Sequence, residues 1–439
     1  MTPAHGSAAA RGRPPAAVMG LLVLAGCSGG SSSSPTAAVG TTPVANTAPV
    51  TVGFGPLGPS GLYFNGIFTS VTVCAPGSTT NCQTIPNVLV DTGSVGLRVL
   101  SSALTVSLPN VQDSSGNVVQ ECLQFGDFSY VWGPVALASI QFPGTGEMAL
   151  QVPGQTANSG IPIQMIAASP SFAVPTGCLA APQSPGMAFD DNTLENLGAN
   201  GILGIGNFPQ DCGSGCTTAS GSLYYVCPGG VCQSLGVALQ QQLWNPVAAF
   251  SSVDNNGVSI SLPSVPATGA ASVTGSLIFG IETQSDNSLG SAQIYEIDQY
   301  GNFPQVVYNG IAYTSPNNGS FIDTGSNAIF FSDAASLAST GIIECTGQNA
   351  GYYCPSATLP FTVTPHGANS VQGAVQFSIA NAANLVSSGF SAFSDLGGDS
   401  GTGPSTDYVD LGLPFFLGRS VFVGIAGTSN TYPNGYWAF

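Results

Sequence analysis

Short apolar runs alternate with turn-forming residues along most of the 439-residue chain. The runs are rich in Val, Ile, Phe and Tyr, and 58 Gly and 32 Pro residues separate them, which favours many strands joined by turns. Only Ser234–Phe250 has the spacing of an amphipathic helix. The pattern therefore predicts a mostly β protein, in a chain long enough for two domains.

One apolar run, Val88–Leu97, is interrupted by Asp-Thr-Gly-Ser, which taken alone is typical of a β-turn. The same arrangement returns in Gly319–Phe331, and each copy is followed at long range by two apolar residues and a glycine. These are Ile202-Leu203-Gly204 and Phe416-Leu417-Gly418, 113 and 95 residues after the aspartates (91 to 204 and 323 to 418). A pair of turns does not predict the paired downstream motif, so we expect two similar halves whose aspartates meet at a pseudo-two-fold axis.

With these motifs the sequence resembles the pepsin-like aspartic proteases over most of residues 49–439, and in particular bacterial lipoproteins with a pepsin-like domain. Gly275–Thr283 resembles the strand that opens the second lobe of that family. The resemblance implies a bilobal fold with pseudo-two-fold lobes. It also implies a catalytic pair, Asp91 and Asp323, supported by Thr92, Gly93, Ser94, Thr324, Gly325 and Ser326.

The implied chemistry is peptide hydrolysis. Two carboxylates about 3 Å apart cannot both ionise in a partly dry site, so they share one proton. The ionised member takes a proton from a bound water, and the protonated member hydrogen-bonds the developing oxyanion and helps protonate the leaving nitrogen. We therefore expect an endopeptidase that acts on peptides or proteins at acidic pH, without cofactor or metal. In the family the threonines bond across the axis and the serines bond the outer carboxylate oxygens.

The first lobe departs from the family in two places. Arg98 stands where the family usually has Trp. The family's flap, a hairpin over the cleft, carries a Tyr, and the corresponding region here is Glu121–Ile140, with Phe125 near the tyrosine position. Tyr130 and Trp132 are the other flap candidates, although both could simply pack within the hairpin. A non-catalytic binding lipoprotein on a pepsin-like scaffold therefore remains the alternative.

The charge composition excludes several functions. Lysine is absent, and four arginines stand against 21 acidic residues, for a net charge of −17. Such a chain repels phosphate backbones, so we expect no nucleic-acid partner. Beyond the amino terminus His366 is the only histidine, which disfavours a Ser-His-Asp triad or a His-rich metal site and favours a loop residue. The acidic segment Asp395–Asp410 has no recognisable calcium-loop pattern and is predicted to be a flexible loop near the site.

The amino terminus predicts export. Arg11 and Arg13 precede a short apolar run that ends in Leu-Ala-Gly-Cys27, which resembles a lipobox and implies cleavage and lipid attachment at Cys27; a plain secretory signal is the alternative. We expect a signal peptide over residues 1–27, a flexible tether over 28–49 and two lobes over 50–255 and 256–439. The protein would be a monomer anchored in the bacterial cell envelope, in the outer membrane on its periplasmic or surface side.

The ten remaining cysteines fit an exported, disulfide-bonded protein. A zinc site formed by the four cysteines between 212 and 232 is the weaker alternative. The expected pairs are Cys74–Cys82, Cys122–Cys178, Cys212–Cys216, Cys227–Cys232 and Cys345–Cys354.

Overall fold

The computed structural model describes residues 45–439 except 62, 128, 168–169, 182–183, 186–188, 318, 332–341 and 401–407. The expected signal peptide, Cys27 and most of the expected tether lie outside these residues. So does the middle of the acidic segment 395–410.

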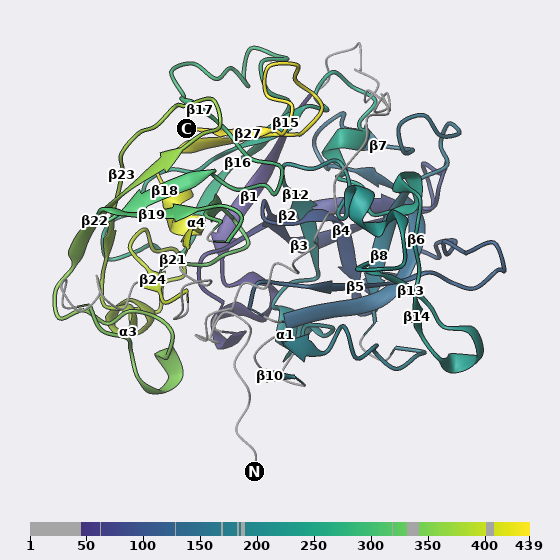
Figure 1. Cartoon of the computed structure of the whole chain (residues 1–439), viewed down its shortest axis with the longest axis horizontal. Helices are drawn as coiled ribbons and strands as arrows, with labels where there is room; N and C mark the ends of the chain where they lie inside the picture. Colours follow the sequence, from purple (N-terminus) through teal and green to yellow (C-terminus); the bar gives the residue numbers. More distant parts are fainter. Residues whose placement is uncertain are drawn as a thin grey trace.

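Two halves of mostly β structure lie side by side, the first coloured purple to teal and the second green to yellow (Figure 1). Four-residue helix α1 (Leu194–Leu197) and short 3-10 turns, among them η6 (Leu239–Gln241) and η7 (Val247–Ala249), interrupt the strands of the first half. Its strands are β1 (Thr47–Gly53), β2 (Gly66–Cys74), β3 (Cys82–Asp91), β4 (Val95–Leu100), β5 (Gln120–Gln124), β6 (Ser129–Gln141), β7 (Met148–Ala149), β8 (Ile161–Ile166), β9 (Ala180–Ala181), β10 (Ser184–Pro185), β11 (Phe189–Asp190), β12 (Gly201–Ile205), β13 (Tyr224–Val226) and β14 (Gln233–Ser234).

The second half has the same character, with α3 (Ala382–Val386) and α4 (Leu413–Phe416) between its strands. No helix in the described part of the chain is long and apolar enough to cross a bilayer. The strands are β15 (Gly257–Ser261), β16 (Val273–Phe279), β17 (Ile294–Glu296), β18 (Gln305–Tyr308), β19 (Ile311–Thr314), β20 (Phe321–Ile322), β21 (Ile329–Phe331), β22 (Leu359–His366), β23 (Val375–Ile379), β24 (Gly397–Gly398), β25 (Val409–Leu411), β26 (Ser420–Gly424) and β27 (Tyr436–Ala438). His366 ends a strand and is not a loop residue.

A central sheet joins the halves. Strand β1 pairs antiparallel with β2 of its own half and with β16 of the second half, and β15, β26, β27 and β17 continue the sheet. Because β1 already begins at Thr47, the expected tether ends before the strand and not at residue 49. Buried and exposed side chains alternate along β1, which is the pattern of a strand with one face on a core.

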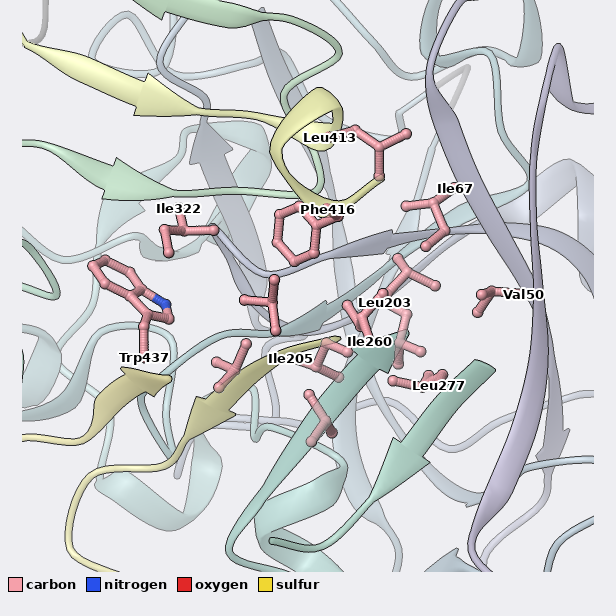
Figure 2. Packing of buried hydrophobic residues seen from close by; sticks show 14 of the residues in the cluster. Val50, Ile67, Leu203, Ile205, Ile260, Leu277, Ile322, Leu413, Phe416 and Trp437 are labelled. Carbon is pink, nitrogen blue, oxygen red and sulfur yellow. The ribbon is translucent and has the colours of Figure 1, made fainter. Parts of the chain in front are cut away.

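That core is continuous between the halves. Figure 2 shows Leu203 and Ile205 of β12 packed in one cluster with Ile322 of β20 and Phe416 of α4, and all four side chains are buried. Shared burial holds the ends of β12 and β20 at fixed positions relative to each other, since tightly packed interiors leave little freedom to shift. The predicted mostly β, bilobal fold is therefore confirmed.

The helix predicted for Ser234–Phe250 is wrong. The segment contains only strand β14 and the 3-10 turns η6 and η7. Pro246 lacks an amide hydrogen and disfavours helical geometry at Asn245. The polar side chains instead tie the segment to loops: Asn245 Nδ2 donates to the Gly206 carbonyl at 2.9 Å, and Gln242 Nε2 to the Gly213 carbonyl at 2.7 Å.

Candidate active site

The first Asp-Thr-Gly-Ser motif forms the turn between β3, which ends at Asp91, and β4. The Asp91 carboxylate is 5% exposed and is held by its own loop. The Gly93 amide donates to Asp91 Oδ1 at 2.8 Å, and the Ser94 hydroxyl donates to Asp91 Oδ2. Two donors on one carboxylate fix its orientation.

The second motif repeats this geometry after β20. The Gly325 amide donates to Asp323 Oδ1 at 2.7 Å, and Ser326 Oγ donates to Asp323 Oδ2 at 3.1 Å. The Asp323 amide donates to the Leu411 carbonyl of β25 at 3.2 Å. Each aspartate is thus presented by the same four-residue loop at the end of a buried strand.

The two loops are tied together by their threonines. The Thr92 amide donates to Thr324 Oγ1 at 3.1 Å, and the Thr324 amide donates to Thr92 Oγ1 at 3.0 Å. Thr324 Oγ1 donates onward to the Val90 carbonyl at 2.8 Å. Both threonines are buried, so these bonds are shielded from competing water.

The glycines of the motifs are required by the close approach of the loops. A Cβ on Gly93 would lie 2.6 Å from Asp323 Cγ, and a Cβ on Gly325 would lie 2.7 Å from Asp91 Oδ1. Each glycine therefore faces the carboxyl group of the opposite lobe, and any side chain there would push the pair apart.

The two carboxyl groups interact electrostatically. The pKa of Asp323 lies well above its usual value because of burial first, then the negative charge of Asp91, then that of Asp410, with a hydrogen bond to Asp91 adding to the effect. Burial and the neighbouring negative charges therefore favour the protonated form of Asp323. The arrangement can present one ionised and one protonated carboxyl group to a bound molecule.

The pair lies in a cleft of about 560 Å³ that is lined by both lobes. The β5–β6 hairpin forms part of its wall through Phe125, Gly126 and Asp127 at the turn. Of the three flap candidates, only Phe125 lines the cleft. Its ring is half-buried and packs against a cluster that includes Val131.

Tyr130 and Trp132 are not flap residues. They lie two positions apart on β6 and so point to the opposite face from Val131, away from the cleft. Trp132 is fully buried, and its ring meets that of Tyr225 edge to face at 5.7 Å between centroids. Both candidates are core residues of the hairpin.

Tyr63 is a cleft residue that the sequence analysis missed. It precedes β2, lines the cleft, and packs edge to face against Phe68. The pKa of its hydroxyl is raised, by burial first and then by the negative charges of Asp91 and Asp191. A neutral phenol in the field of Asp91 offers the site a hydrogen-bond donor that Phe125 lacks.

Arg98, which stands where the family has Trp, is fully buried. Its guanidinium pairs with Glu121 of β5 at 2.6 Å and with Asp211 at 3.4 Å, and it donates to the Val95 carbonyl at 2.7 Å. Burial, followed by the charge of Glu121, raises the pKa of Asp211 well above its usual value. The ion pair thus links the strand after the Asp91 loop to the first strand of the flap hairpin.

In the second lobe, the segment beside the aspartate loop is not the Phe416-Leu417-Gly418 motif that the sequence suggested. In the first lobe, strand β12 runs parallel to β3 and places Gly204 of the downstream motif beside Asp91. Beside the second loop, however, lies β25, which pairs with β20 so that Leu411 is opposite Ile322 and Gly412 follows next to Asp323. The segment Phe416–Gly418 lies after this point, at the end of α4. The motif next to the second aspartate is therefore Asp410-Leu411-Gly412.

The cysteines form the five disulfides of the expected pairs. The zinc alternative therefore does not hold, since the four cysteines between 212 and 232 are joined two by two. Within the described part of the chain, no cluster of three His, Cys, Asp or Glu side chains is arranged to hold a metal ion.

Comparisons with known proteins give a family and similar solved structures. No curated protein matches the chain. Basic 7S globulin from soybean, a solved structure, is similar at 11% sequence identity, over 90% of this chain and 96% of that chain, with a TM-score of 0.45. Residues 42–439 match the model of the family described as "Protein of unknown function (DUF3443)". The chain therefore belongs to the DUF3443 family.

Proposed function

We propose that the protein is an acid-active aspartic endopeptidase in which Asp91 and Asp323 activate a water between them. The observation that carries the proposal is the pair of motif glycines, each within contact distance of the carboxyl group of the opposite lobe. Two turns with unrelated roles would not need to meet in this way at the floor of one cleft.

The roles of the two carboxyl groups follow from their surroundings. Asp91 receives hydrogen bonds from Gly93 and Ser94, as Asp323 does from its own loop, and acts as the general base because Asp323 holds the shared proton. Asp323, whose pKa is raised, keeps the proton and donates it to the carbonyl oxygen of the scissile bond. Water attack then needs no further nucleophile from the protein.

Polypeptide is the substrate class that suits the cleft. It is lined from both lobes and bordered by a hairpin turn, so an extended segment can lie across the two carboxyl groups. Tyr63 supplies a hydroxyl near Asp91, in place of a flap tyrosine. A substrate bound here would exclude water and strengthen every polar contact with the pair.

One observation favours a second candidate function, a binding lipoprotein without catalysis. Phe125 is the cleft-facing aromatic residue of the hairpin, and it cannot donate a hydrogen bond. In this alternative the two motifs hold the lobes together and the cleft binds a peptide without cleaving it.

For location we propose a lipid anchor at Cys27 that holds the protein in the bacterial cell envelope. Support comes only from the sequence around Cys27, because residues 1–44 lie outside the described part. Metabolic labelling with palmitate, compared between the wild type and Cys27→Ser, tests the anchor: loss of label in the variant supports it, and unlabelled wild-type protein contradicts it.

The enzymatic proposal is tested with the full exported chain, its disulfides formed, by cleavage of a denatured protein between pH 3 and 7 with and without pepstatin. Asp91→Asn and Asp323→Asn should each lower the rate by at least ~10³-fold, because one carboxyl group cannot be acid and base alone. Glu195→Gln, which removes an exposed charge on α1, is the matched control. No cleavage by a folded wild type, or equal cleavage by wild type and Asp91→Asn, would favour the binding lipoprotein.

A further inference from the structure

We propose that Asp410 is a third carboxyl group of the site, a positioning residue that holds the shared proton on Asp323 and acts on it through Ser326. The consequence for catalysis rests on the proposed function. The effect on the protonation of Asp323 does not, and it can be measured in a protein that cleaves nothing.

The first argument is a break in the two-fold symmetry. In the first lobe β12 lies parallel to β3 with Ile202 opposite Leu89. In the second lobe β25 lies parallel to β20 with Asp410 opposite Phe321. Asp410 thus occupies the position of Ile202, two residues before the glycine beside the catalytic loop. A carboxyl group is costly at a buried strand position where the other lobe has an apolar side chain.

The second argument is the hydrogen bonding of Ser326. Its hydroxyl donates to Asp323 Oδ2 at 3.1 Å and is also within hydrogen-bond reach of Asp410. A hydroxyl has one proton, so it can donate to only one of the two carboxyl groups at a time. A protonated Asp410 donates to Ser326, which then donates to Asp323. An ionised Asp410 instead receives the serine proton.

The third argument is the environment of Asp410. The side chain is 4% exposed and belongs to the lining of the cleft, and its Oδ1 has no hydrogen-bond partner among the described residues. The residues opposite it on β20 and β21 are both phenylalanines. The titratable groups that face it in the described part of the chain are Asp91, Asp323 and Tyr408. No cation compensates its charge there.

The effect of Asp410 on the proton of Asp323 follows from these contacts. Burial raises the pKa of Asp410 well above its usual value, and the Ser326 hydrogen bond opposes that rise. The pKa of Asp323 is raised by burial, by Asp91 and by the charge of Asp410 as well. Once Asp410 is ionised, its charge keeps the proton on Asp323, because a nearby negative charge disfavours ionisation. The pair of Asp91 and Asp323 therefore remains singly protonated to higher pH than it would with isoleucine at position 410.

The experiment compares Asp410→Asn and Asp410→Ile with the wild type and with Glu195→Gln. Asparagine keeps a donor for Ser326 without the charge. Isoleucine is the residue at the equivalent position of the first lobe, Ile202. Both Asp410 variants should move the alkaline limb of the kcat/KM profile down by about one pH unit, because a nearby like charge typically raises a pKa by about that much. Asp410→Ile should also lower kcat without a matching change in KM. Glu195→Gln should leave the profile unchanged.

A second measurement does not need turnover. Carbon-13 labelling of the Asp carboxyl groups, with the Asp323 signal assigned by its loss in Asp323→Asn, gives the titration of Asp323 directly. Its midpoint should fall by about one pH unit in Asp410→Asn. An unmoved midpoint in a folded variant overturns the inference even if the protein is a protease. A lowered midpoint in a protein that cleaves nothing supports the inference and contradicts the proposed function.

Discussion

Thr92 and Thr324 exchange hydrogen bonds across the lobe junction, each backbone amide donating to the hydroxyl of the other residue at 3.1 and 3.0 Å. The exchange ties two loops that are 232 residues apart in the chain and fixes the separation of Asp91 and Asp323. Replacing either threonine by valine would keep its shape and leave a buried amide without an acceptor, which typically costs about 1–3 kcal/mol.

We therefore expect Thr92→Val and Thr324→Val to lower the free energy of unfolding by about 1–3 kcal/mol and kcat by at least ~10-fold. Thr92→Ser and Thr324→Ser keep the hydroxyl and are the matched controls. Urea unfolding and peptide-cleavage rates measure the two effects. Valine variants as active as the serine variants would show that the exchange does not position the carboxyl groups.

The motif glycines predict that no side chain fits between the two aspartate loops. Gly93→Ala places a methyl group 2.6 Å from Asp323 Cγ, where no atom fits unless the loops move apart. We expect loss of nearly all activity in a protein that still folds. Gly53→Ala on β1 is the control, because no atom lies within 4 Å of a Cβ at that position. A Gly93→Ala variant with wild-type turnover would contradict the proposed role of the pair.

The buried ion pair of Arg98 gives a prediction about stability. Arg98→Met removes the cation and leaves Glu121 buried and uncompensated, a change that typically costs about 3–5 kcal/mol. The double variant Arg98→Met/Glu121→Leu should recover part of the loss, since it removes the Glu121 charge and leaves only Asp211, whose pKa burial already raises. Thermal unfolding of the three proteins tests this. Equal stability of the single and double variants would mean that the pair is not what holds β4 against β5.

Sequence reasoning found the aspartates because their chemistry is local: four residues form each loop, and the loop repeats. The second downstream motif was misplaced because Phe416-Leu417-Gly418 has the expected two apolar residues and a glycine, whereas the segment that ends six residues earlier at Gly412 begins with Asp410. Only the strand register shows that β25 lies beside the loop of Asp323. A Cβ on Gly412 would lie 2.0 Å from the Ala328 carbonyl, a constraint that the sequence does not display.

The flap candidates show a second limit. Period-two alternation could have grouped Tyr130 with Trp132 and separated them from Val131, but it does not show which face meets the cleft. Tyr63 lies 28 residues before Asp91 in an irregular segment without a motif, so nothing in the sequence pointed to it. The partners of Arg98 depend in the same way on tertiary packing, since Asp211 lies 113 residues further along the chain.

Tyr63 gives a prediction about the missing flap hydroxyl. Tyr63→Phe removes the phenol near Asp91 but keeps the ring that packs against Phe68. If the hydroxyl assists the reaction, kcat should fall by about 10-fold with little change in stability. Combining it with Phe125→Tyr, which places a hydroxyl on the hairpin, should restore part of the rate. An unchanged kcat in Tyr63→Phe would mean that Tyr63 contributes only the packing of its ring and that its hydroxyl takes no part in the reaction.

Stability should fall as pH rises, because several buried carboxyl groups hold protons in the folded state that the unfolded chain releases. Glu147 is the clearest case: burial raises its pKa to about 8, with Asp254 adding to the rise. A folded-state pKa above the unfolded value of 4.5 contributes stability that is fully present below pH 4.5 and is lost as pH rises toward 8. Asp323 and Asp410, whose pKa values are also raised, act in the same direction. Thermal unfolding midpoints should therefore be higher at pH 4.5 than at pH 8.

Glu147→Gln isolates this contribution. Glutamine keeps an acceptor for the Ser252 hydroxyl, which donates to Glu147 Oε2 at 2.6 Å, but it cannot ionise. Between pH 5 and 8, the free energy of unfolding should fall by about 1–3 kcal/mol less in the variant than in the wild type. This range is smaller than the full pKa shift implies, because part of the shift comes from the interaction with Asp254. The exposed Glu195→Gln, which also replaces one acidic residue, should leave the slope unchanged. If both variants flatten the curve to the same extent, general charge repulsion causes the pH dependence and the buried carboxyl group does not.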